Sequence, residues 1–293
     1  MALARQAAPV LPVLAAGPEQ PREFVFSDAD FRALAQVAYD YAGIALSDSK
    51  RNLLYSRLSR RLRHLGFDSF AEYREYLQGN RSEIENFINS ISTNHTKFFR
   101  EAHHFEHLRA HVAVPFPQAL RAGTARRLRI WSAGCSSGEE PYTIAVVLKR
   151  EIPDIRSQDV KILATDIDTE VLAKAAQGIF AVSATDDVPA AYRDFFRRDK
   201  DGRHVTIDSE LRDAIAFRRL NLMDEWPFRG PFDAIFCRNV MIYFDGATKT
   251  RLIERFTRMI RPGGWLYIGH SESLIGAHPG LQSVGRTVYR RLP

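Results

Sequence analysis

Residues 128–145 constrain the fold of this chain more than any other stretch. An apolar run at 128–131 enters a turn of small residues that contains Gly134 and Gly138, and an apolar helical pattern occupies 142–148. A strand, a glycine-containing turn and a helix, in that order, are typical of the first unit of a nucleotide-type α/β domain. We therefore expect Gly134 to let the backbone approach a bound ligand.

The charges of this turn restrict what the ligand can be. The spacing of Gly134 and Gly138 matches neither the dinucleotide-binding nor the phosphate-cradling glycine pattern. Glu139 and Glu140 stand where the helix would begin, and carboxylates there would repel a phosphate. The sequence thus predicts a ligand without phosphate that carries positive charge or hydroxyl groups.

Length and composition set the outer bounds. The chain has 293 residues, of which 45% are hydrophobic and 26% charged, which suits a globular protein of two domains or of one large domain with an appendage. No apolar run is long enough to predict a membrane-spanning helix. Two cysteines, Cys135 and Cys237, do not form a disulfide framework, so we expect a cytoplasmic protein.

Four segments are expected along the chain. Residues 1–23 contain four prolines and predict a disordered tail, and 24–91 predict a helical domain. Residues 92–127 predict a linker helix and connection, and 128–293 an α/β domain with a small β insertion at about 179–216. Within the helical domain, Ser27 and Asp48 are candidate N-caps, and Gly43 is a candidate helix end.

The second predicted helix is strongly basic. Residues 50–65 contain six Lys or Arg and no acidic residue, with leucines along the opposite stripe. A solvated polar face is one interpretation, and a docking face for acidic protein or nucleic acid is the other. No acid at i,i+4 neutralises these charges, which favours docking.

Polar residues follow several predicted strands, where open α/β sheets bind ligands. Asp166 ends the second strand, at the position that commonly holds a ribose diol. Residues 203–208 and 214–217 predict two short strands of the β insertion, near the turn at Asp201-Gly202. Residues 231–237 predict a buried strand of the main sheet.

Three histidines, His103, His107 and His111, recur at i, i+4 and i+8. No cysteine accompanies them, and the nearby acids fall on other faces of the helix. We expect no metal site there.

Five motifs in order make the chain resemble the CheR family of chemoreceptor-glutamate methyltransferases over about residues 24–291. They are NHTKFFREAHHF at 94–105, WSAGCSSGEEPY at 131–142, ATDIDTEVL at 164–172, FDAIFCRNVMIYF at 232–244 and GHSES at 269–273. The resemblance implies a class I methyltransferase sheet with an inserted β-subdomain, preceded by an all-helical domain. It also implies S-adenosylmethionine as methyl donor and glutamates of the chemoreceptor cytoplasmic helical bundle as acceptors.

The resemblance carries specific residues with it. The positions that match the family's cofactor contacts, together with Gly134 from the turn argument, are Asn94, Thr96, Arg100, Gly134, Glu139, Asp166, Asn221, Leu222, Arg238 and Asn239. Glu139 would lie near the cationic end of the cofactor, Asp166 at its ribose, and Asn221 with Leu222 at the adenine edge. Arg100 and Tyr243 would orient the acceptor carboxylate at the methyl group, and Arg57, Arg60 and Arg61 would hold the acceptor helix.

One departure from the family concerns the inserted β-subdomain. Some members grip a receptor tail peptide through a glycine-rich loop there, whereas residues 197–204 have one glycine and many charges. We therefore expect an enzyme that does not need the tail, acting as a monomer without membrane insertion. A nucleic-acid methyltransferase is the alternative, suggested by the pI of about 9.4, and a non-catalytic cofactor sensor is a third reading. No aromatic residues interleave with the basic ones, which disfavours nucleic acid as a partner.

Overall fold

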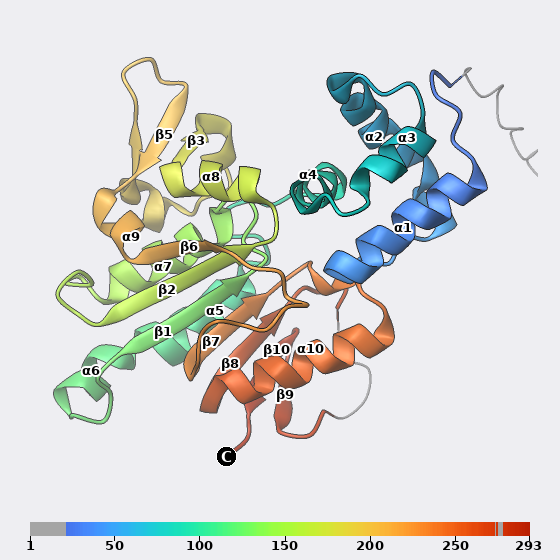
Figure 1. The fold of residues 1–293 in the computed structure, drawn as a ribbon. Helices are drawn as coiled ribbons and strands as arrows, with labels where there is room; N and C mark the ends of the chain where they lie inside the picture. The colour runs from blue at the N-terminus through green and yellow to red at the C-terminus, as the bar shows by residue number, and fades with distance from the viewer. Residues whose placement is uncertain (1–21, 273, 275–277) are drawn as a thin grey trace, which may run out of the picture.

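The computed structural model describes residues 22–272, 274 and 278–293, and it consists of a helical domain and an α/β domain (Figure 1). The predicted disordered tail falls almost entirely on residues 1–21, which lie outside the described residues. Within the described part of the chain, no helix has the length and apolar character needed to cross a membrane.

The helical domain contains four α-helices and one 3-10 turn. They are α1 (Asp28–Ala42), η1 (Asp48–Lys50), α2 (Arg51–Leu65), α3 (Phe70–Leu77) and α4 (Arg81–Ile91). Ser27 caps α1 and forms a capping box with Asp30, and Gly43 ends the helix with φ 71°, as predicted. The prediction that Asp48 caps the second helix is wrong, because η1 precedes α2 and shifts its N-cap to Lys50.

The segment between the domains is more helical than the single linker helix predicted for 92–127. α5 (His103–Leu108) continues through a π-helical turn, η2 (Arg109–Ala113), toward α6 (Phe116–Arg121). Pro115 and Pro117 lie at the start of α6. A helix tolerates proline there because its first N–H groups need no partner within the helix.

A seven-stranded sheet forms the centre of the α/β domain. Its strands are β1 (Leu128–Ala133), β2 (Val160–Asp166), β6 (Ile215–Arg219), β7 (Phe232–Cys237), β8 (Ile260–Ile268), β9 (Leu281–Gly285) and β10 (Val288–Arg291). The order is β6-β2-β1-β7-β8-β10-β9, and β10 runs antiparallel to both its neighbours. The end of the described chain forms the hairpin β9–β10, with β9 at the edge of the sheet.

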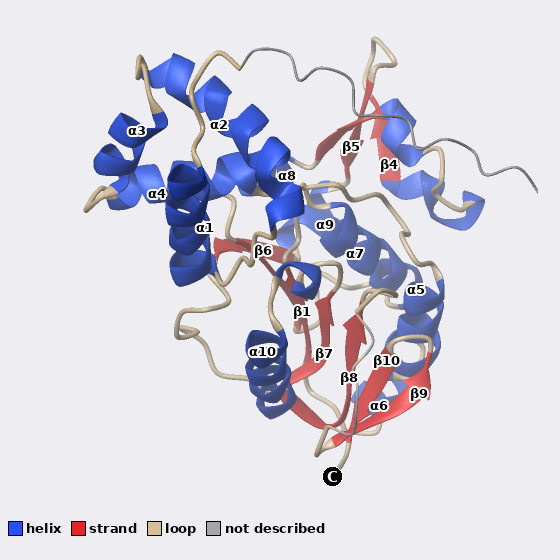
Figure 2. Cartoon of the chain, turned by 90° about the vertical axis from the view of Figure 1, so that its right-hand side faces the viewer, coloured by secondary structure: helices blue, strands red, loops and turns tan. Residues whose placement is uncertain are grey.

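Helices cover both faces of this sheet (Figure 2). α7 (Glu139–Glu151) and α5 pack on one face, where Ile130 and Phe236 belong to a common core. α10 (Gly246–Met259) packs on the other, with Trp131 and Leu266. Successive side chains of a strand point to opposite faces of the sheet, so neighbouring residues of β1 pack in the two different cores.

The β-subdomain differs from its prediction. It is a three-stranded antiparallel sheet of β3 (Ile179–Ala181), β5 (His204–Ile207) and β4 (Phe196–Arg198). The predicted hairpin exists, but the strand that pairs with 204–207 in it is 196–198 and not 214–217. The segment 214–217 instead enters β6, which pairs in parallel with β2. The remaining elements there are α8 (Thr169–Gln177), η3 (Val182–Thr185), η4 (Ala190–Phe195) and α9 (Ser209–Asp213).

Strand order places the ligand site. The chain goes from β1 to β2 and β6 on one side, and then returns to β7 on the other side of β1. Open α/β sheets bind ligands at such a reversal, beyond the carboxyl ends of the strands. The helical domain sits over this end of the sheet, where the backbone N–H of Ala45 donates to the carbonyl of Tyr243 at 2.8 Å.

Candidate active site

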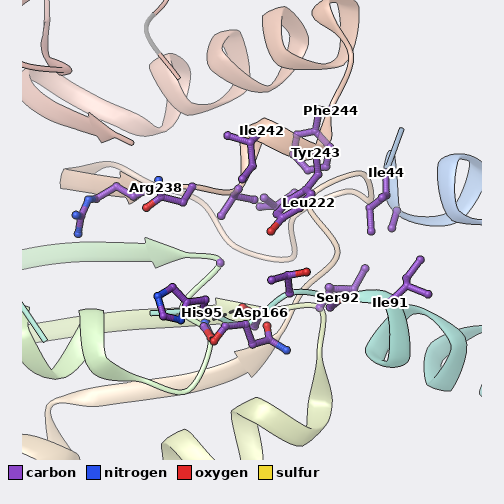
Figure 3. Close-up of a pocket in the computed structure, with 18 of the residues that line it drawn as sticks. Ile44, Ile91, Ser92, His95, Asp166, Leu222, Arg238, Ile242, Tyr243 and Phe244 are labelled. Carbon is purple, nitrogen blue, oxygen red and sulfur yellow. Dashed lines mark hydrogen bonds between the residues drawn. The ribbon is translucent and has the colours of Figure 1, made fainter. Parts of the chain in front are cut away.

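A cavity of about 530 Å³ lies between the two domains, at the carboxyl ends of β1, β2 and β7. This volume is within the range of small-molecule sites. Figure 3 shows Ile44, Ile91 and Ser92 of the helical side facing the loop with Tyr243 and Phe244. Most of the predicted site residues line it, namely Asn94, Thr96, Arg100, Gly134, Asp166, Asn221, Leu222, Arg238, Asn239 and Tyr243.

Gly134 lines the cavity and has a packing role there. Its φ of 80° is left-handed, which favours glycine. A Cβ built there would lie 2.3 Å from Cγ2 of Val240. The missing side chain therefore makes room for the loop after β7, and close approach of a ligand to Gly134, which lines the cavity, stays a prediction.

Asp166 ends β2 at the cavity, as predicted. One carboxylate oxygen accepts the N–H of Ser136 at 2.8 Å, and the other accepts the N–H of Asp168 at 3.0 Å. Burial raises the pKa of this carboxyl. Each oxygen can accept more than one hydrogen bond, so Asp166 can still receive ligand hydroxyls.

Asn94 is held by the same corner of the sheet. Its amide donates to Asp168 at 2.7 Å, while its backbone carbonyl accepts the hydroxyl of Ser136 at 3.1 Å. Asp168 also caps α8 through its side chain. This network joins the segment before Arg100 to the β1 and β2 turns.

Glu140, and not Glu139, is the glutamate that lines the cavity. Glu139 accepts a hydrogen bond from Ser137 at 2.7 Å and does not line this cavity, so its contact with the cofactor stays a prediction. Glu140 accepts the Ser132 hydroxyl at 2.7 Å and pairs with Arg238 at 3.0 Å. Burial raises the pKa of Glu140. Both glutamates are evident in the sequence, but the phase of α7 and its packing on the sheet determine which of them lines the cavity.

Arg238 connects this ion pair to Arg100. It donates to the backbone carbonyl of Arg100, and its guanidinium lies 5.3 Å from the ring centre of Phe105. The Nε atom of Arg238 is buried without a hydrogen-bond partner among the described residues. The Arg100 side chain donates to the carbonyl of His95 at 2.9 Å. Arg238 therefore fixes the Arg100 loop while part of the residue lines the cavity.

The Tyr243 loop is held by Glu272, whose role the sequence did not reveal. This buried carboxylate accepts backbone N–H groups from Asn239 at 2.7 Å, Ile242 at 3.1 Å and Gly269 at 2.6 Å. Asn239 has a φ of 60°, which the network helps to maintain. Burial raises the pKa of Glu272. The GHSES motif after a predicted strand was the only signal in the sequence, and it did not indicate which groups Glu272 would bind.

Asn221 lines the cavity, and its carboxamide also forms hydrogen bonds within the protein. Its amide nitrogen donates to the carbonyl of Tyr41 at 2.6 Å, and its oxygen accepts the N–H of Met223 at 3.0 Å. Asn221 thus ties the end of α1 to the α/β domain, and Leu222 remains beside it on the cavity wall.

Two of the three predicted docking arginines have internal partners. Arg57 donates to the carbonyls of Ile91 and Ser92, and Arg61 pairs with buried Glu83, with Nε to Oε1 at 2.9 Å. Both hold the helical domain together, so their assignment to docking is corrected. Arg60 is exposed on α2 and stays a candidate.

The three spaced histidines do not share one site, because His107 and His111 lie together while His103 has another partner. His107 contacts the hydroxyl of Tyr267 through Nδ1 at 3.0 Å and stacks on His111, while His103 contacts the carbonyl of Arg286. Neighbouring His104 is fully buried, and burial lowers its pKa to about 3. These contacts give each ring a packing role.

Comparison with known proteins assigns both domains. Residues 94–290 match the family described as "CheR methyltransferase, SAM binding domain", where SAM is S-adenosylmethionine, and 29–92 match "CheR methyltransferase, all-alpha domain". "Chemotaxis protein methyltransferase 2" of Pseudomonas aeruginosa is 44% identical, covering 92% of this chain and 95% of that protein. The "Chemotaxis protein methyltransferase" of Salmonella typhimurium and that of Escherichia coli are each 41% identical, covering 92% of this chain and 93% of each relative.

Proposed function

The chain belongs to the CheR methyltransferase family, and we propose that it methylates glutamate side chains of chemoreceptors. As a member, it is an S-adenosylmethionine-dependent chemotaxis methyltransferase with a SAM-binding domain at 94–290. This membership does not favour the nucleic-acid alternative. The acceptor is the part that is proposed.

The cavity suits the methyl donor. S-adenosylmethionine has a ribose diol, an amino-acid carboxylate and two cationic centres, and it lacks phosphate. Asp166 can accept the ribose hydroxyls, and the positive charge of Arg238, which lines the same cavity, attracts the carboxylate. When bound, the donor supplies an electrophilic methyl group on a sulfonium.

The observation that carries the proposal is that Arg100 and Tyr243 line one cavity with these donor-binding residues. A glutamate has an ordinary pKa of about 4.3, so its carboxylate is already ionised near neutral pH and needs no general base. Arg100 has donors that can orient such a carboxylate, and the hydroxyl of Tyr243 can donate to it as well. Both groups therefore suit positioning of an acceptor.

The chemical step is an in-line displacement. A carboxylate oxygen of the acceptor forms a bond to the methyl carbon while the bond from that carbon to sulfur breaks, and the electron pair stays on sulfur. The anion and the cation thereby become a neutral ester and a neutral thioether. The chain contributes orientation, and its cavity walls remove water from the acceptor carboxylate.

The partner and setting are also part of the proposal. We infer that the substrate is a glutamate-rich helical bundle in the cytoplasmic part of a receptor. We also infer that the enzyme acts on it as a monomer in the cytoplasm. The tip of the β4–β5 hairpin supports independence from a receptor tail, because its charges pair internally. His204 Nδ1 lies 3.3 Å from Asp199, and Arg203 Nε lies 3.2 Å from Asp201.

Transfer of a radiolabelled methyl group tests the proposal. Purified protein, labelled S-adenosylmethionine and purified receptor cytoplasmic fragments are incubated, and the product is treated with mild base. Carboxyl methyl esters release the label as volatile methanol, whereas methylated bases keep it. Label that enters nucleic acid, or that survives base, would refute glutamate methylation.

A further inference from the structure

Two exposed apolar side chains flank the cavity, one from each domain. Leu53 on α2 is 40% exposed and Ile242 beside Tyr243 is 47% exposed, and both line the cavity. Figure 3 shows Ile242 on the same wall as Tyr243. A single exposed apolar residue is ordinary, but two at the rim of one cavity mark a candidate contact surface.

Basic residues continue from Leu53 along the same face of α2. Lys50, Leu53, Arg57 and Arg60 follow one another at helical spacing of three or four residues. Arg57 holds residues 91–93, which form part of the cavity wall. Lys50 and Arg60 are exposed and make no ion pair within the described residues. The cavity rim therefore carries the apolar Leu53 and the cationic Lys50, and exposed Arg60 lies further along the helix, outside the cavity lining.

The size of a helix dictates how a glutamate can enter. A helix with its side chains is about 10 Å across, so it stays at the mouth while one side chain reaches inward. Its neighbours one turn away then lie against the rim, on the same face as the acceptor glutamate. The rim residues meet these neighbours, and they come from both domains.

Resting on the proposed function, we propose that the acceptor helix lies across this mouth and packs apolar side chains on Leu53 and Ile242. Its acidic residues face Lys50 and Arg60. Docking therefore spans both domains, instead of using the basic face of α2 alone. Charge complementarity between this rim and a glutamate-rich helix identifies the occupant.

Steady-state kinetics on Leu53→Ala and Ile242→Ala test this surface. A purified receptor cytoplasmic fragment serves as acceptor, and calorimetry measures S-adenosylmethionine binding separately. Each variant should raise KM for the fragment about five- to tenfold, with kcat and donor affinity unchanged, because rim contacts act before chemistry. Leu53→Met, which keeps an apolar side chain, should stay within about twofold of wild type.

Val284→Ala is the matched control. Val284 is 46% exposed on β9, outside the cavity lining, so the KM of the Val284→Ala variant for the receptor fragment should not change. Thermal melts check that each variant folds. Unchanged KM in both rim variants overturns the proposal, and so does a fall in kcat at unchanged KM, which would mean that Ile242 only positions Tyr243.

The wild-type reaction separates this inference from the proposed function. Base-labile methylation of the fragment by wild type, with rim variants that behave like wild type, rejects the rim alone. Absence of methylation and of fragment binding by wild type rejects both.

Discussion

The two loops that carry Arg100 and Tyr243 meet at one cavity but are held in different ways. The Arg100 loop depends on a charged side chain, because Arg238 donates to the carbonyl of Arg100 and pairs with Glu140. The Tyr243 loop depends on backbone N–H groups that converge on the single carboxylate of Glu272.

The difference predicts different sensitivities. A buried ion pair is costly to break from one side, because the remaining charge is left in a poorly solvating interior. A carboxylate that accepts hydrogen bonds from several backbone N–H groups sets the backbone conformation of the loop, independently of the neighbouring side chains. The first loop should respond mainly to charge and the second mainly to the loss of an acceptor.

Loss of Glu140 should have the largest effect. Glu140→Leu removes the closer of the two carboxylates that face buried Arg238 and leaves only Glu101, at 3.5 Å, so we expect the free energy of unfolding to fall by about 4 kcal/mol. Urea denaturation measures this. Glu139→Leu on the adjacent, equally buried glutamate should cost clearly less, and equal losses would show that the ion pair is not the cause.

Loss of Glu272 should come next. Glu272→Ala removes the acceptor for three backbone N–H groups, and we expect a loss of about 3 kcal/mol in unfolding free energy. Turnover should fall with it, since the Tyr243 loop loses its support. Glu272→Gln keeps one acceptor oxygen and should recover part of the stability and part of the turnover. A Glu272→Ala protein as stable as wild type would contradict the role of Glu272 in holding the Tyr243 loop.

Direct removal of the two functional groups should change chemistry without changing the fold. Arg100→Ala and Tyr243→Phe should each lower kcat about 100-fold, because a misplaced acceptor loses the advantage of orientation. Donor affinity by calorimetry should fall much less. Near-normal turnover in both variants would remove these residues from the proposed site.

Acid should lower the free energy of unfolding through protonation of His104, which lies near the Arg100 loop. This buried ring has a pKa lowered to about 3 in the folded protein, against about 6.5 when unfolded. Its contribution to stability is therefore complete above pH 6.5 and declines as pH falls toward 3, by up to about 1.4 kcal/mol per pH unit. His104 lies 3.4 Å from Glu101, which also faces Arg238 at 3.5 Å.

Denaturation at pH 7.5, 6.5 and 5.5 measures this slope. His104→Gln should flatten it, whereas His64→Gln on the exposed face of α2 should leave it as in wild type. An unchanged slope in His104→Gln would mean that other groups set the acid sensitivity.

The sequence by itself determined the architecture and the family. Caps such as Ser27, helix ends such as Gly43 and the strand–turn–helix at 128–145 are local signals, and the structure realises them where the residues indicate. Asp166 also followed from its place after a strand, because polar residues after parallel strands meet at one edge of a sheet. Apart from Gly134, the other predicted cavity residues came from the family resemblance.

Only the tertiary structure decided which partner each polar group takes. Glu139 and Glu140 are adjacent in sequence, and packing of α7 on the sheet turned Glu140 toward Arg238. The basic helix lacked acids nearby in sequence, yet Arg61 found Glu83 on α4 and Arg57 found carbonyls at its end. Sequence spacing reports neighbours within one element, whereas a buried charge is satisfied by whatever element folds against it.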